Sequence, residues 1–99
     1  MTNSKPDNSK LYTLIIDYGG GTYVTQAVAD SASLAPSKCI EYWDIVGTAG
    51  ELSDDLKKEI ILKLKDESFV PLSGMKNVWS GGILLKKGLM LMNLVETSV

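Results

Sequence analysis

Three consecutive glycines, Gly19 to Gly21, lie between two segments that are rich in β-branched and aromatic residues. Residues of these two kinds favour β-strands. Glycines supply the positive φ angles of a tight turn between two strands. The sequence therefore predicts a hairpin of two antiparallel strands over residues 11–18 and 22–28. An isolated two-stranded hairpin is only marginally stable in water, so the rest of the chain must cover at least one of its faces.

A second hairpin is predicted near the other end of the chain, over residues 77–85 and 89–96. The residues between these strands are Lys86, Lys87 and Gly88, and the glycine suits the left-handed position of a short turn. Inside the earlier strand, Gly81 and Gly82 indicate a bulge or a close approach by another backbone. Residues 69–72 contain a proline, which limits them to a sheet edge or a loop.

The middle of the chain has apolar residues at helical spacing. They are Cys39, Ile40, Trp43 and Val46 in one stretch, and Leu56, Ile60 and Leu64 in the next. Helices are predicted over residues 36–46, where Pro36 suits the first turn and Gly47 the end, and over 54–65, where Ser53 suits the N-cap. The order ββααββ predicts an α+β fold, a four-stranded antiparallel sheet with two helices packed on one face. Residues 11–97 form one domain and residues 1–10 a disordered tail.

The first and the last of the four predicted strands do not alternate cleanly between apolar and polar residues. Apolar side chains that point to both faces are Leu11, Leu14, Ile15, Ile16, Leu89, Met90, Leu91, Met92, Leu94 and Val95. Two short helices cover one face, so the other face exposes more apolar area than a small monomer usually tolerates. The sequence thus predicts a protein-binding surface, most simply a homodimer interface. The alternative is that the helices lie on both faces and bury everything.

The residues predicted to contact the partner are adaptable methionines and large aromatics, which suit interfaces. They are Tyr12, Tyr18, Tyr23, Trp79, Met90 and Met92. The small size and acidity of the chain are compatible with an antitoxin- or immunity-like inhibitor, and equally with an accessory subunit.

The chain contains no histidine and one cysteine, Cys39. The commonest general base and the commonest transition-metal ligand are therefore absent, and one cysteine cannot form a structural zinc site. Because Cys39 lies on the apolar stripe of its helix, we interpret it as a small buried hydrophobe. The sequence predicts no catalytic residue, no metal site and no cofactor.

The segment IIDYGGGTY, residues 15–23, is similar to the phosphate-contacting hairpin of the actin and Hsp70 ATPase superfamily. The resemblance implies that Asp17 helps to hold a metal-bound water and that Gly19 to Thr22 face phosphate. It covers nine of the 99 residues, and that superfamily closes two large lobes over its nucleotide. A glycine-rich hairpin turn is the favoured interpretation.

A second function class remains open, in which the chain is a small-molecule-binding or enzymatic domain. Its ligand-binding residues would be Asp17, Gly19, Gly20 and Gly21, in a pocket completed by Tyr18, Tyr23, Gly81 and Gly82. A concave cleft at these glycines would favour this class over a protein-binding module.

The charge and hydropathy of the chain argue against nucleic acid and membranes as partners. The net charge is -2 and the pI is about 5.0, whereas nucleic-acid-binding proteins usually carry a basic face. The first ten residues are polar and unlike a secretory signal, and no apolar run approaches the roughly 18 residues of a membrane helix. We expect a cytoplasmic protein that binds neither membranes nor nucleic acid.

Overall fold

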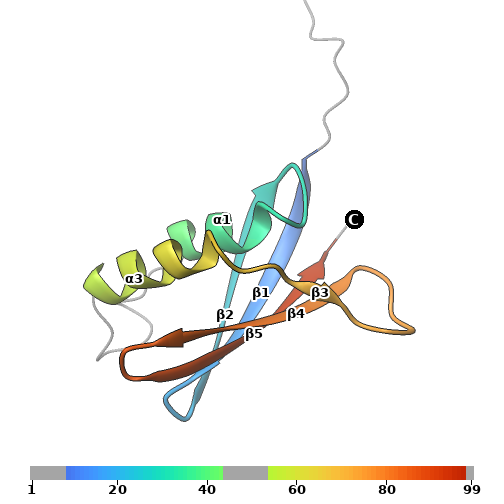
Figure 1. Ribbon diagram of the computed structural model, residues 1–99. Helices are drawn as coiled ribbons and strands as arrows, with labels where there is room; N and C mark the ends of the chain where they lie inside the picture. Colours follow the sequence, from blue (N-terminus) through green and yellow to red (C-terminus); the bar gives the residue numbers. More distant parts are fainter. Residues whose placement is uncertain (1–8, 44–53, 98–99) are drawn as a thin grey trace, which may run out of the picture.

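The computed structural model describes residues 9–43 and 54–97. These residues form one antiparallel sheet with two helices on the same side of it (Figure 1). The elements in chain order are β1 (Lys10–Tyr18), β2 (Gly21–Ala29), α1 (Ala35–Tyr42), α3 (Asp54–Leu64), β3 (Val70–Pro71), β4 (Val78–Leu85) and β5 (Gly88–Glu96). The predicted α+β class and the antiparallel sheet with two helices are confirmed. Within the described residues, no helix is both long and apolar enough to cross a membrane.

The first hairpin turns over two residues. Tyr18 pairs with Gly21, and the intervening Gly19 and Gly20 have φ angles of 59° and 83°. A type I′ turn requires positive φ at both central positions, and its twist matches that of the flanking strands. The glycines therefore serve the turn geometry that their sequence predicts.

The sheet has five strands, so the prediction of four is corrected. The added strand, β3, pairs Val70 with Ser80 and Pro71 with Trp79 at the outer edge of β4. Proline has no N–H to give to a ladder, which is why this segment occupies an edge. The strand order is β2-β1-β5-β4-β3. The two central strands, β1 and β5, come from opposite ends of the described chain.

The pairing of β4 with β5 runs without interruption from Val78 and Val95 to Leu85 and Gly88. The sequence predicted either a bulge or a close backbone approach at Gly81 and Gly82. The uninterrupted pairing shows that there is no bulge at these two residues. The close approach at Gly81 involves a side chain, not a backbone. A Cβ on Gly81 would lie 2.8 Å from Cδ1 of Phe69, so the missing side chain makes room for that ring.

The first helix ends earlier than predicted, at Tyr42. Trp43 adopts an extended conformation, with φ -73° and ψ 122°. This conformation ends the helix while the Trp43 side chain stays buried and packs against Tyr23 at a centroid distance of 5.6 Å. The expected last helical residue Val46, its terminator Gly47 and the expected N-cap Ser53 lie outside the described residues.

The two helices are linked at the end of α1 by a lysine from α3. Lys57 Nζ donates to the carbonyl oxygens of Glu41 at 2.6 Å and Trp43 at 3.1 Å. The last carbonyls of a helix have no intrahelical partner, and a cation there also interacts favourably with the helix dipole. Lys57 thus stabilises the end of α1, rather than only solvating a helix face.

The core lies between the helices and one face of the sheet. Its side chains come from alternate positions of each long strand, as the two-residue period of a strand requires. The largest fully buried members are Leu14, Ile16, Ile40, Ile60, Met90, Met92 and Leu94. The other face of the sheet has no covering layer among the described residues (Figure 1).

Candidate functional site

The strand register assigns one set of side chains to the face opposite the helices. Ile15 lies between Val24 and Asn93, and Leu91 lies between Asp17 and Gly82. We call this surface the open face. Its members are Leu11, Thr13, Ile15, Asp17, Thr22, Val24, Gln26, Val28, Val78, Ser80, Gly82, Leu84, Leu89, Leu91, Asn93 and Val95.

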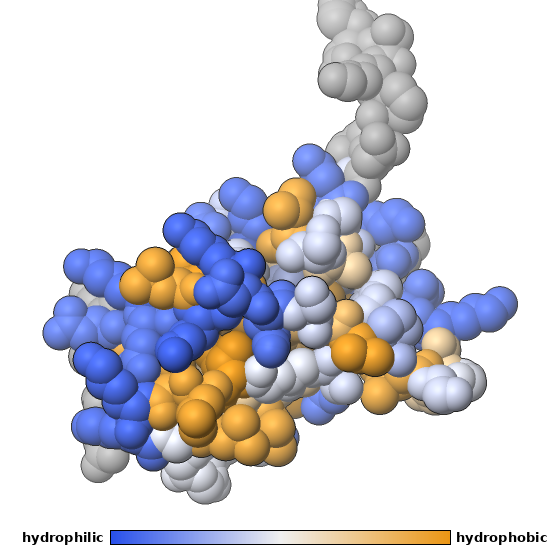
Figure 2. Space-filling view, in the orientation of Figure 1, coloured by the Kyte–Doolittle hydropathy of each residue, from blue (hydrophilic) through white to orange (hydrophobic). Residues whose placement is uncertain are grey.

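Large apolar side chains on the open face are exposed to solvent. The exposed fractions are 68% for Leu84, 59% for Val24, 56% for Leu89, 55% for Val28 and 49% for Leu91. Hydrophilic residues cover much of the helical side in Figure 2, and hydrophobic surface gathers where β4 and β5 emerge below the helices. Leu84 and Leu89 are cross-strand partners, so their exposed side chains adjoin one another, as is typical of an interaction surface.

The open face is almost free of charge. Asp17, at one end of β1, is its one ionisable member, although 22% of the chain is charged. Its carboxylate accepts a hydrogen bond of 2.6 Å from the Thr22 hydroxyl. Across the same two strands, Gln26 Nε2 donates to Thr13 Oγ1 at 2.8 Å. Because these polar groups form hydrogen bonds with one another, a partner that covered the face would leave fewer of them without a hydrogen bond than if they were bonded only to water.

The residues that the sequence analysis assigned to partner contact lie on the opposite, helix-covered side. Met90, Met92 and Tyr12 are buried, at 0%, 1% and 3% exposed. The expected surface location of these three side chains is therefore corrected. Their burial has a simple origin: successive residues of a strand point to opposite faces, so β5 presents Leu89 and Leu91 instead.

The other three nominated aromatics are half-buried and pack against the core. They are Tyr18, Tyr23 and Trp79. Trp79 contacts the Tyr12 ring at a centroid distance of 6.2 Å. These rings fill space between the sheet and its covering layer, and a role in partner contact stays an untested prediction. No alternation in the sequence of β5 identifies the exposed set, because the register that exposes it depends on the pairing of β5 with β1 and β4.

The glycine turn borders a shallow hollow of about 360 Å³. The hollow is lined by Asp17, Tyr18, Gly19, Gly20, Gly21, Thr22, Leu89 and Leu91. The second glycine pair is not part of this lining, and Gly81 faces Phe69 on the helix-covered side of the sheet. The pocket expected between the two glycine pairs is thus not formed as a unit, and ligand binding at the turn stays an untested prediction.

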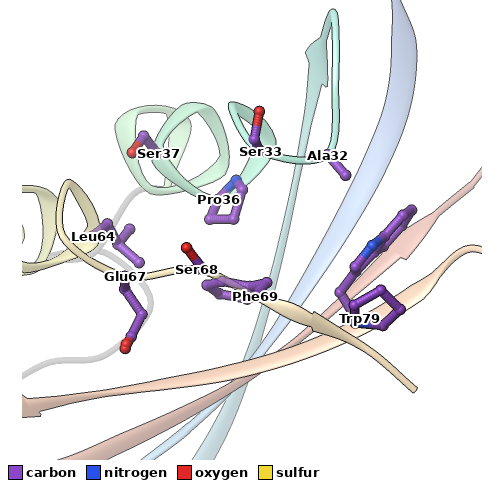
Figure 3. A pocket seen from close by; sticks show the side chains of 10 residues that line it. Ala32, Ser33, Pro36, Ser37, Leu64, Glu67, Ser68, Phe69 and Trp79 are labelled. Atoms are coloured by element: carbon purple, nitrogen blue, oxygen red, sulfur yellow. The ribbon is translucent and has the colours of Figure 1, made fainter. Parts of the chain in front are cut away.

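A second cavity, of about 390 Å³, lies between the start of α1, the chain that leaves α3, and the sheet edge (Figure 3). It is lined by Ala32, Ser33, Pro36, Ser37, Leu64, Glu67, Ser68, Phe69, Pro71 and Trp79. Of these residues, only Glu67 has a carboxylate, and Figure 3 shows it pointing away from Pro36 and Phe69. The lining therefore offers rings and hydroxyls but no paired acid and base. Of these residues, Pro36, Leu64, Pro71 and Trp79 were noted in the sequence, and none of them as part of a cavity.

Cys39 is completely buried under α1, where its Sγ donates to the Tyr12 carbonyl oxygen at 3.8 Å. Burial raises the pKa of this thiol from 9.0 to about 11. The thiolate is the nucleophilic form of cysteine, so a protonated, inaccessible thiol is chemically inert at neutral pH. The interpretation of Cys39 as a buried hydrophobe is consistent with this environment.

The raised pKa of Cys39 predicts a loss of stability at alkaline pH. An unfolded thiol ionises near pH 9.0, before the folded one, so deprotonation favours the unfolded state as the pH rises from about 9 to 11. Urea midpoints measured across this range should fall more steeply for the wild type than for Cys39→Ala. The variant is needed as a control because burial also raises the pKa of Tyr12. Parallel curves for the two proteins would contradict the assignment.

No group of three or more acidic, cysteine or histidine side chains in residues 9–43 and 54–97 is arranged to hold a metal ion. Comparison with protein-family models, curated proteins and solved structures finds no match to the chain.

Proposed function

We propose that the chain is a small, non-catalytic protein-binding module whose contact surface is the open face, and that its simplest partner is a second copy of itself. The observation that carries this proposal is the nearly uncharged apolar surface on the uncovered side of the sheet. Depletion of charge distinguishes the centre of an interface from ordinary protein surface.

The size of the open face supports a stable contact. Four strands of about eight residues cover roughly 26 Å by 19 Å, a projected area on the order of 500 Å². Side chains corrugate such a face, so its accessible area exceeds the projection and approaches the roughly 800 Å² per partner of a standard interface. Two such faces would pack about 10 Å apart as a sandwich.

The charge distribution supports a second copy as the partner. A chain with net charge -2 repels its own copies, and a symmetric interface brings two copies of every charged group on the shared surface into the contact. With Asp17 alone on the open face, and at one end of it, this repulsion is small. A different protein could use the same face, as it would for an immunity-like inhibitor or an accessory subunit, and the test below includes that outcome.

The test replaces one exposed leucine by glutamate on each side of the sheet. Leu91→Glu adds a charge to the open face, whereas Leu62→Glu adds the same charge to an exposed position on α3. Covering an unpaired carboxylate is costly, so Leu91→Glu should weaken self-association by at least about tenfold in Kd, or ~1.4 kcal/mol. Leu62→Glu should leave it unchanged.

Sedimentation equilibrium from about 1 to 100 µM measures the change, a range that brackets micromolar dissociation constants. Equal effects of the two variants would contradict a specific role for the open face. A strictly monomeric wild type would contradict self-association and leave a different protein as the partner, for which binding would show the same difference between the two variants.

A further inference from the structure

The two edge strands of the sheet, β3 and β2, differ in length and in the residues that protect an edge from pairing with another strand. At one edge, β3 has two residues, one of them a proline. At the other edge, β2 runs for nine residues with neither a proline nor a charged residue. Sheet proteins usually protect an exposed edge with short strands, prolines or charges, because unpaired backbone groups there can recruit another strand. Within residues 9–43 and 54–97, only the β3 edge has such protection.

The pairing with β1 determines which backbone groups of β2 point outward. Gly21 and Tyr18 flank a two-residue turn and form a hydrogen-bonded pair, so Tyr23, Thr25 and Ala27 also direct their N–H and C=O groups toward β1. The alternate residues direct theirs to the free edge. These residues are Thr22, Val24, Gln26 and Val28, and among the described residues β2 pairs with β1 alone.

A row of side chains on α1 borders the same edge. Leu34, Lys38 and Tyr42 are spaced by four residues and therefore share one side of the helix. Pro36 and Ser37, on another side of α1, line the cavity near the end of α3, and α1 packs over β2. The side of α1 with Leu34, Lys38 and Tyr42 therefore faces away from α3 and beyond the edge of the sheet. Leu34 is 52% exposed and Tyr42 is 72% exposed.

We propose that β2 pairs edge to edge with β2 of a second copy, in the antiparallel direction, to form one continuous ten-stranded sheet. This inference rests on the proposed self-association and adds a second contact to it. A twofold axis at Thr25 sets Val24 opposite Gln26 of the second copy, and Thr22 opposite Val28. In this register, every outward N–H and C=O group of the four edge residues finds a partner.

The same axis brings the two α1 helices together. Thr25 Oγ1 donates to the Cys39 carbonyl oxygen at 3.1 Å, and Cys39 Sγ donates to the Tyr12 carbonyl oxygen of β1, so the middle of α1 lies above both β2 and β1. The two helices then run antiparallel, with Lys38 of each copy close to the Tyr42 ring of the other. A lysine ammonium is attracted to the face of an aromatic ring, so this side of α1 complements itself.

Edge pairing leaves the open face uncovered, because a twofold axis normal to the sheet keeps all four helices on one side. The two contacts are therefore compatible, and they assemble four copies where their twofold axes cross at a right angle. Leu91→Glu removes the face contact and should leave edge-paired dimers. Val24→Pro removes an outward N–H that β1 does not use. Because Val24 also belongs to the open face, its effect on the edge contact is measured in the Leu91→Glu background, in which the face contact is already lost.

Amide hydrogen exchange tests the edge contact directly. In the wild type, the amides of Val24 and Gln26 should exchange at least tenfold more slowly at high than at low protein concentration. The amide of Thr25, which bonds to β1 in every state, should show no such dependence. Concentration-independent exchange at Val24 and Gln26 in associated samples would overturn edge pairing and leave the open-face proposal intact.

The substitutions supply the second measurement. Val24→Pro should raise the Kd of the edge contact at least tenfold in the Leu91→Glu background, whereas Val24→Thr, which keeps the N–H, should change it less than threefold. Equal effects of the proline and threonine variants would overturn edge pairing. If Val24→Pro does not fold, the exchange rates and Val24→Thr decide the question. A wild type that is monomeric throughout would overturn edge pairing and self-association through the open face, and would leave the open face as a contact for a different protein.

Discussion

Met92→Ala is expected to lower the free energy of unfolding by about 2–5 kcal/mol, whereas Leu91→Ala should change it by less than about 1 kcal/mol. The two residues are neighbours in β5, but Met92 is 1% exposed and Leu91 is 49% exposed. Truncating the methionine removes buried apolar surface and leaves a cavity between the sheet and the helices. Truncating the leucine removes a side chain of which about half already faces water in the isolated chain, so little buried apolar surface is lost.

Urea denaturation at a concentration where the wild type is monomeric measures both changes. Low concentration matters because Leu91→Ala would otherwise also report a lost intermolecular contact. A large loss for Leu91→Ala together with a small one for Met92→Ala would mean that β5 presents the opposite face to the helices. That outcome would remove the open face as described and the proposed function with it.

Gly81→Val is expected to destabilise the fold by about 1–3 kcal/mol, because it forces extra volume into a packed region. A Cβ at this position would lie 2.8 Å from Cδ1 and 2.9 Å from Cε1 of Phe69. An aromatic ring cannot bend away as the end of a flexible chain can, so Phe69 must shift as a whole. Since Phe69 and Trp79 line the same cavity, the shift should also change Trp79 fluorescence.

Gly82→Val is the matched control for this prediction. Its Cβ would approach Cδ2 of Leu91 at 3.3 Å, and that exposed side chain can rotate away. We expect its effect on the urea midpoint to be clearly smaller than that of Gly81→Val, with little change in tryptophan emission. Equal destabilisation by the two variants would show that strand propensity, rather than the Phe69 contact, explains the need for glycine at position 81.

The exposed apolar residues indicate a binding surface because they are neighbours, not because each of them is exposed. Single exposed leucines and valines are common on protein surfaces and need no explanation. Here Leu84 and Leu89 are direct cross-strand partners, and Val24 adjoins Ile15 in the same way. Cross-strand neighbours form a continuous surface, which is the property that a partner protein can bind.

The local elements could be predicted because their causes are local. Three glycines between two β-rich segments produce a hairpin, and leucine and isoleucine at every fourth position of residues 54–65 produce an amphipathic helix. The end of α1 was missed, because the extended backbone of Trp43 is held by its burial against Tyr23. That contact joins residues twenty positions apart, so no local pattern records it.

By itself, the sequence determined the class of the fold, its two hairpins, its two helices and the excess of apolar strand residues. Only the tertiary structure decided which of those residues face solvent. Along β5 every residue from Leu89 to Met92 is apolar, so no alternation within the strand distinguishes its two faces. The pairing with β1 and β4 and the docking of the helices make that choice, burying Met90 and Met92 and leaving Leu89 and Leu91 exposed. Long-range pairing sets strand register, and a shift of one residue would have exchanged the two faces.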